Sequence, residues 1–132
     1  ILSLFILEEI MARILIVDVS PAEMHKLVLI LEKNGYQVLK AENGADGVAL
    51  AKQEQPDAVV MDIVMPGLNG FQATRQLTKI PETAHIPVII VTSKDKESDR
   101  LWGERQGAKA YLIKPTDEQT LVQTLAQLLA KP

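Results

Sequence analysis

The chain has 132 residues and no cysteine. Without cysteine it can form neither a disulfide framework nor a thiolate metal site, and it is compatible with the reducing cytoplasm, which is the compartment we expect. It also lacks an excess of positive charge, because 14 Lys and Arg are outnumbered by 17 Asp and Glu, giving a formal net charge of −3. A surface that binds nucleic acid mainly by neutralising phosphates is therefore not expected.

A long hydrophobic run is absent as well. The first ten residues, ILSLFILEEI, are too short to span a bilayer and have neither the basic front nor the cleavage site of a signal peptide. Membrane insertion is not expected. We predict that residues 1–11 are an N-terminal extension, with Met11 as the natural start and the preceding decapeptide an artefact of upstream translation or cloning, and that 12–132 form one domain. The alternative is an ordinary extension that packs on the domain.

Apolar runs of strand length alternate five times with helical patterns. Strands are predicted at 13–18, 36–41, 58–62, 86–92 and 109–113, and helices at 21–34, 44–55, 70–79, 94–106 and 117–130. The first helix has Ser20 as its N-cap, Pro21 at its first position and Gly35 as its C-cap. The last helix is expected to have Thr116 as its N-cap, with acids in its first turn.

The central strands are continuously apolar rather than alternating, which is typical of a parallel sheet covered by helices on both faces. The sequence thus predicts a doubly wound α/β sandwich. In such folds ligands bind at the carboxyl ends of the strands, near the point where the strand order reverses. Functional residues should therefore be sought where the strands end.

Four strand ends deliver polar groups to that edge. The first strand ends in Asp18, the third in Asp62 and the fourth in Thr92 and Ser93, while the fifth leads into Lys114. Two adjacent carboxylates repel each other unless a cation neutralises them. Carboxylate ligands without cysteine or a histidine cluster suit Mg²⁺.

A carboxylate next to a metal ion, a lysine and a hydroxyl group is equipped to accept a phosphoryl group as an acyl phosphate. We expect Asp62 to be the nucleophile. Pro66, Gly67 and Gly70 follow it in the stretch MDIVMPGLNG and favour a turn that presents backbone carbonyls to the site.

Three motifs, in this order and at these places in the fivefold pattern, resemble the receiver domain of two-component response regulators of the chemotaxis-regulator type. They are MDIVMPGLNG around Asp62, VTSK around Thr92 and YLIKP around Lys114. The resemblance runs from about residue 12 to residue 130. It implies a flavodoxin-like (βα)₅ fold with strand order 2-1-3-4-5.

The resemblance also implies a role for each matching residue. Asp62 would be the phosphoacceptor, Thr92 the hydroxyl that follows the phosphoryl group, and Lys114 the counter-charge, with a cis peptide bond to Pro115. Tyr111 would be the aromatic side chain whose rotation reports the switch. Asp18, Asp62 and the backbone carbonyl of Val64 would hold Mg²⁺.

The implied partners are a sensor histidine kinase or phosphotransfer domain and a downstream protein target, with no enzyme activity beyond self-catalysed phosphotransfer. The segments AENGADGVALA and GLNGFQATRQL and the helix containing Trp102 most resemble single-domain regulators of type IV pilus twitching motility.

One position departs from the pattern. Receivers of this type usually end the first strand with two adjacent acids, of which the second is the direct metal ligand, whereas this chain has Asp18 followed by Val19. Loss of an anionic ligand should weaken Mg²⁺ binding and slow phosphorylation. The chain could be a naturally degenerate receiver, or a competent receiver that carries a substitution.

Each candidate also has a simpler interpretation. Asp18 could be only a helix-entry residue, Lys114 an exposed lysine and Thr92 a residue favoured in strands. Tyr111 and Trp102 fit packing as well as switching, and His25 and His85 are expected to be surface residues. For the whole chain, the alternatives are a phosphorylation-independent interaction module, favoured by Val19, and a small flavodoxin-like enzyme, disfavoured because no glycine-rich loop follows the first strand.

Overall fold

The computed structural model describes residues 11–130, so the expectations for residues 1–10 lie outside the described residues. Five parallel strands form one sheet in the order β2-β1-β3-β4-β5, which confirms the predicted fold. The strands are β1 (Arg13–Val17), β2 (Gln37–Ala41), β3 (Ala58–Met61), β4 (Val88–Thr92) and β5 (Ala110–Ile113). The helices are α2 (Pro21–Lys33), α3 (Gly44–Glu54), α4 (Gly70–Lys79), α5 (Glu97–Arg105) and α6 (Glu118–Leu129).

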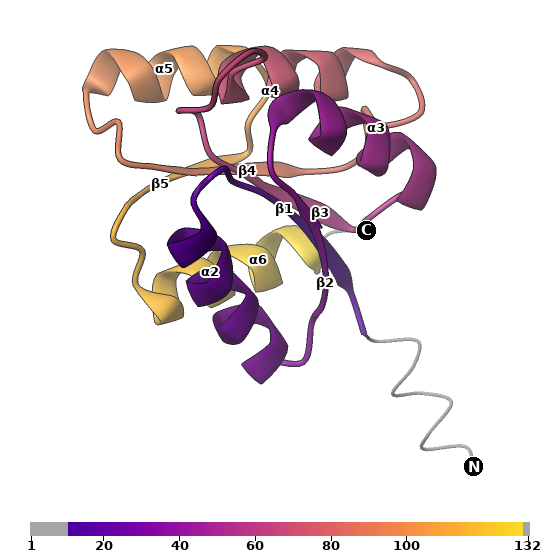
Figure 1. The fold of residues 1–132 in the computed structure, drawn as a ribbon, viewed down its shortest axis with the longest axis vertical. Coiled ribbons are helices and arrows are strands. Elements are labelled where there is room, and N and C mark those ends of the chain that lie inside the picture. Colours follow the sequence, from indigo (N-terminus) through magenta and orange to yellow (C-terminus); the bar gives the residue numbers. More distant parts are fainter. Residues whose placement is uncertain (1–10, 131–132) are drawn as a thin grey trace.

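The helices cover both faces of the sheet (Figure 1). Ile14 and Ile16 of β1 point to the face covered by α2 and α6, where Leu27 and Leu121 complete one core. Leu15 and Val17 of β1 point to the opposite face, which is covered by α3, α4 and α5. Because both faces are buried, β1, β3 and β4 read as continuous apolar runs.

The helix ends follow the local capping chemistry. The Ser20 side chain accepts a hydrogen bond from the backbone N–H of Glu23, as predicted for an N-cap. The C-cap of α2 is Asn34 and not Gly35 as predicted; Gly35 follows it with φ +88°, a left-handed conformation that glycine adopts without steric cost.

Two helix starts were predicted wrongly. The N-cap of α6 is Asp117 and not Thr116, because the Asp117 carboxylate accepts the hydrogen bond from the backbone N–H of Thr120 at 3.0 Å. Asp117 therefore precedes the first turn instead of lying in it. Helix α5 begins at Glu97 instead of 94, after an exposed segment, 94–96, that supplies no side-chain cap.

The carboxyl ends of β1, β3, β4 and β5 meet at one edge of the sheet, which is where the candidate site lies. Among the described helices, none has the length and hydrophobicity needed to cross a membrane.

Candidate functional site

The site is centred on two buried carboxylates and one ammonium group. Asp18 and Asp62 are 2% and 7% exposed. The Nζ atom of Lys114 lies 2.8 Å from Oδ2 of Asp18 and 3.1 Å from Oδ2 of Asp62, and donates a hydrogen bond to each. One lysine thus bridges the two acids, offsetting the repulsion expected between them.

Strand register brings the two acids together. Val17 of β1 is paired with Met61 of β3, so that the next residue of each strand, Asp18 and Asp62, emerges at the same level. The backbone N–H of Asp62 donates to the carbonyl of Val17 at 3.0 Å and extends the ladder by one step. The pairing of two strands far apart in sequence therefore builds the acid pair.

The backbone after β3 holds the Asp62 carboxylate. Its Oδ1 atom accepts hydrogen bonds from the backbone N–H groups of Ile63 at 2.7 Å and Val64 at 3.4 Å, while Oδ2 faces Lys114. Gly67 has φ +72° in the turn that follows. A Cβ atom on Gly70 would overlap the Asp62 carbonyl oxygen, so only glycine allows α4 to start this close to the acid.

Lys114 is fixed through its main chain. Its backbone N–H donates to the carbonyl of Thr92 at 2.8 Å, and its peptide bond to Pro115 is cis, as expected. Burial acts to lower the pKa of Lys114, but the hydrogen bonds and negative charges of Asp18 and Asp62 outweigh burial and raise the pKa above its ordinary value. The side chain therefore stays positively charged at neutral pH.

Thr92 and Tyr111 are linked through the main chain of Lys94. Thr92 is fully buried, and its Oγ1 atom accepts a long hydrogen bond, 3.4 Å, from the backbone N–H of Lys94. The Tyr111 hydroxyl donates to the carbonyl of Lys94 at 2.8 Å. Burial, followed by the charges of Asp99, Asp62 and Asp95, raises the pKa of Tyr111 to about 12, so this hydroxyl remains a donor at neutral pH.

Val19 and Val64 lie at the rim, with 43% and 53% of their surfaces exposed. The described residues contain no group of three or more His, Cys, Asp or Glu placed to hold a metal ion. The predicted donors, which are the carboxylates of Asp18 and Asp62 and the backbone carbonyl of Val64, are hard oxygen ligands of the kind that Mg²⁺ takes together with several waters. They fit Mg²⁺ chemically, but both carboxylates are also bonded to Lys114 in this structure.

Two neighbours of the site were missed in the sequence. Glu23, in the first turn of α2, brings its Oε2 atom to 4.0 Å from Nζ of Lys114 as a third acid. Its place at the start of a helix that follows β1 could have indicated this, because that helix begins at the same edge of the sheet. The second neighbour is the main chain of Lys94, which bonds to Thr92 and Tyr111. Because these bonds do not depend on the type of side chain at position 94, the sequence could not predict them.

The other candidates lie away from the acids. His25 and His85 are exposed, as predicted. Trp102 is 48% exposed on α5 and contributes no group to the acid pair. Asp18 makes the contact expected of a helix-entry residue, because its Oδ1 atom accepts a hydrogen bond from the backbone N–H of Ser20 at 2.9 Å, and its role as a metal ligand stays a prediction.

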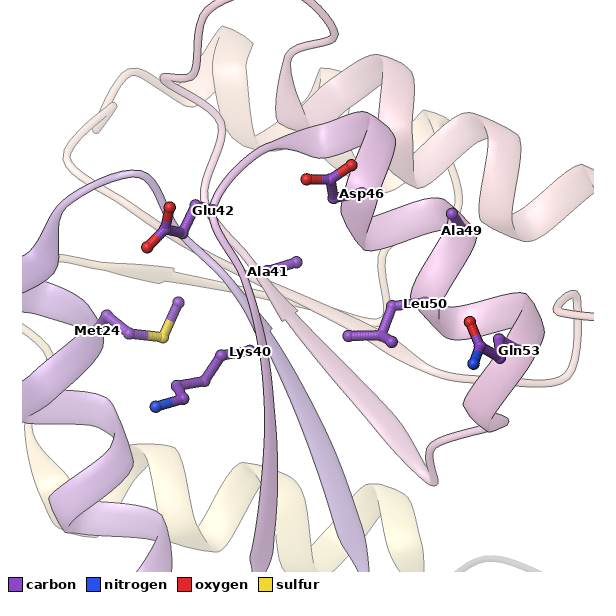
Figure 2. A pocket seen from close by; sticks show the side chains of 8 residues that line it. All are labelled: Met24, Lys40, Ala41, Glu42, Asp46, Ala49, Leu50 and Gln53. Carbon is purple, nitrogen blue, oxygen red and sulfur yellow. The ribbon is translucent and has the colours of Figure 1, made fainter.

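A separate pocket of about 480 Å³ lies beside β2 (Figure 2). It is lined by Met24 of α2, by Lys40 and Glu42 at the end of β2, and by Asp46 and Leu50 of α3, among others. No residue of the acid pair or its lysine lines this pocket, so the pocket is distinct from the candidate site.

Known proteins resemble this chain in sequence. The family model described as "Response regulator receiver domain" matches residues 14–126. Protein PilH of Pseudomonas aeruginosa is 72% identical over 120 residues, which cover 91% of this chain and 99% of PilH. Response regulator PleD of Caulobacter vibrioides is 39% identical over 110 residues, covering 83% of this chain and 24% of PleD.

Solved structures show the same fold. The chemotaxis protein CheY4 of Vibrio cholerae superposes with a TM-score of 0.84 at 27% identity, covering 89% of this chain and 98% of CheY4. The receiver domain of the sensor histidine kinase PA1611 of Pseudomonas aeruginosa gives a TM-score of 0.85 at 27% identity, covering 92% and 99% of the two chains. That structure has a magnesium ion coordinated in its active site cleft.

Proposed function

This chain belongs to the response regulator receiver domain family, and on that premise we propose that it is a phosphoacceptor switch whose acceptor is Asp62. The observation that carries the proposal is the Asp18–Lys114–Asp62 arrangement, in which one ammonium group lies within hydrogen-bonding distance of two buried carboxylates.

The chemistry is phosphoryl transfer from a phosphohistidine. A carboxylate oxygen of Asp62 attacks the phosphorus atom, the phosphorus–nitrogen bond breaks, and the histidine nitrogen leaves and takes up a proton. The product is an acyl phosphate on Asp62. Lys114, which is hydrogen-bonded to Asp62, would neutralise the transferred oxygens, and the Thr92 hydroxyl would bond to one of them.

Mg²⁺, held by Asp18, Asp62 and the carbonyl of Val64, would neutralise charge on the transferring group. Val19 cannot contribute a ligand from its side chain, so we expect weaker Mg²⁺ binding than in a site with an acid at that position. Lys114 then supplies a larger share of the positive charge.

The signal leaves the site through Thr92 and Tyr111. When the Thr92 hydroxyl turns to the phosphoryl group, it would no longer accept the hydrogen bond from the backbone N–H of Lys94. Because the carbonyl of Lys94 accepts a hydrogen bond from the Tyr111 hydroxyl, the change would reach Tyr111. The face formed by α5, β5 and α6 then changes its affinity for a target protein. The donor would be a histidine kinase or phosphotransfer domain in the cytoplasm, and the pathway type IV pilus twitching motility, as the 72% identity to Protein PilH supports.

A second function has its own supporting observation. Val19 puts an exposed apolar side chain at the usual place of a metal ligand. A receiver that no longer accepts a phosphoryl group would serve as a constitutive protein-interaction module.

The test is phosphorylation by acetyl phosphate, with and without Mg²⁺, read by intact mass on this chain, on Val19→Asp and on Asp62→Ala. The switch predicts that this chain gains one phosphoryl group and that Asp62→Ala gains none. If only Val19→Asp gains it, the interaction module is the correct function.

A further inference from the structure

Helix α5 is attached to the domain through very little side-chain surface. Of its nine residues, all of which the structure describes, Gly103 alone is buried. Its large apolar side chains, Leu101 and Trp102, are 52% and 48% exposed. Its N-cap, Lys96, makes no side-chain capping bond within the described part of the chain.

Tyr111 contacts this helix region at two places. Its hydroxyl holds the carbonyl of Lys94, three residues before α5 begins. Its ring lies under Gly103, where an added Cβ atom would be 3.1 and 3.2 Å from the Cδ2 and Cε2 atoms of Tyr111 and 2.9 Å from Cδ1 of Ile90. These distances are shorter than ordinary van der Waals contacts between carbon atoms.

Glycine at this position is otherwise unfavourable. In the interior of a helix, glycine makes the helix less stable than alanine does. The backbone of Gly103 has the helical conformation, which alanine adopts without strain. The close approaches of the Ile90 Cδ1 atom and of the Tyr111 ring are therefore the features that require glycine here.

A methyl group at 103 would lie too close to both neighbours, so both would have to give way. The Cδ1 atom ends the fully buried Ile90 side chain, which packs in one cluster with Tyr111, so it needs space on the side of the ring. Tyr111 is only partly buried and can move towards solvent to provide that space. The methyl group would thus act mainly on the position of Tyr111 relative to α5.

We propose that Gly103 is the positioning residue that couples Tyr111 to α5, so that the position of the Tyr111 ring sets that of α5 and of the exposed Leu101 and Trp102. The inference deepens the proposed switch and rests on it only for the stimulus that moves Tyr111. The contact between Gly103 and Tyr111 exists with or without phosphorylation.

The experiment is a double-mutant cycle of Gly103→Ala with Tyr111→Ala and Tyr111→Phe, followed by thermal unfolding. With the ring absent, the Cδ1 atom of Ile90 can turn into the vacated space, and Gly103→Ala should raise the Tm by about 4 °C through helix propensity. With tyrosine or phenylalanine present, the gain should vanish or become a loss, because both rings occupy the same space. An equal rise in all three backgrounds would overturn the proposal.

Trp102 is the only tryptophan of the sequence, so its fluorescence reports on the surroundings of α5. A change in stability alone would not alter the fluorescence of the folded protein. Gly103→Ala should shift its emission maximum and its quenching by acrylamide, and adding Tyr111→Ala should cancel that effect of the methyl group. Glu104→Ala, at the exposed neighbouring position, is the matched control and should show no coupling to Tyr111. Unchanged Trp102 emission in Gly103→Ala would contradict the coupling.

If Gly103→Ala does not fold, the double variant with Tyr111→Ala should fold, because the space is then available; failure of both would overturn the proposal. The phosphorylation test gives an independent result. If the double-mutant cycle shows coupling but the chain is not phosphorylated, the proposed switch is wrong, while Gly103 remains the link between Tyr111 and α5. Phosphorylation without coupling would remove only the role of Gly103.

Discussion

At the scale of single residues, Lys114 is the side chain on which the site depends most. It is the cation that lies between Asp18 and Asp62, both of which are buried at the edge of the sheet. Removing one partner from a buried charge pair costs more than the pair contributes, because the remaining charges lose their compensation.

Lys114→Gln should therefore lower the free energy of unfolding at neutral pH by about 3 kcal/mol. The folded pKa of Lys114 is raised above 10.5, so its stabilising contribution is complete below pH 10.5 and is lost as the pH rises through the folded pKa. Urea unfolding of both chains from neutral to alkaline pH checks this. A stability difference that stays constant above the folded pKa, or that grows there, would contradict it.

Two buried threonine hydroxyls, those of Thr74 and Thr116, have no hydrogen-bond partner among the described residues. An unpaired buried hydroxyl is destabilising, and valine has nearly the same shape. Thr116→Val is expected to raise the free energy of unfolding by about 1 kcal/mol, measured by urea unfolding.

Thr83→Val is the matched control for this change. Thr83 is also fully buried, but its hydroxyl donates to the carbonyl of Leu77 at 2.7 Å. Its replacement should lower the free energy of unfolding by about 1 kcal/mol. Changes of the same sign in Thr83→Val and Thr116→Val would show that the unpaired hydroxyl is not the cause.

At the scale of helices and strands, end chemistry explains which boundaries could be predicted. The start of α2 carries the unambiguous pair Ser20 and Pro21 and was predicted correctly. Before α6, Thr116 and Asp117 can both cap a helix, and only the structure shows that Asp117 accepts the bond. The start of α5 has no capping side chain to mark it.

Asp117→Ala should consequently lower the free energy of unfolding by about 1 kcal/mol, because the first turn of α6 loses its capping bond. Chemical denaturation measures the change, and Asp117→Asn, which can still accept the bond, should recover most of it. A loss as large in the asparagine variant as in the alanine variant would contradict the capping role.

At the scale of the whole molecule, the sequence predicted the fold and the meeting point of the polar residues for one reason. In a parallel sheet all strands end at the same edge, so residues that follow different strands converge there. Val17 of β1 is paired with Met61 of β3, and this register places the next residues, Asp18 and Asp62, beside each other. The resemblance to receiver domains is confirmed by the family match and by the 72% identity to Protein PilH.

What the sequence could not predict depends on side-chain direction and close packing. The approach of Glu23 to Lys114 depends on how its side chain leaves the first turn of α2. The contact of Tyr111 with Gly103 depends on the path of α5 over β5. Neither leaves a periodic pattern or a motif in the chain.

The central claim is that Asp62, and no other acid, receives the phosphoryl group. The most direct measurement is reduction of the acetyl phosphate-treated protein with borohydride, which converts an aspartyl phosphate into homoserine, followed by peptide mass spectrometry. If Asp62 is the acceptor, homoserine is expected at position 62 and unmodified aspartate at position 18. Homoserine at position 18, or at no position in a chain treated with both acetyl phosphate and Mg²⁺, would contradict it.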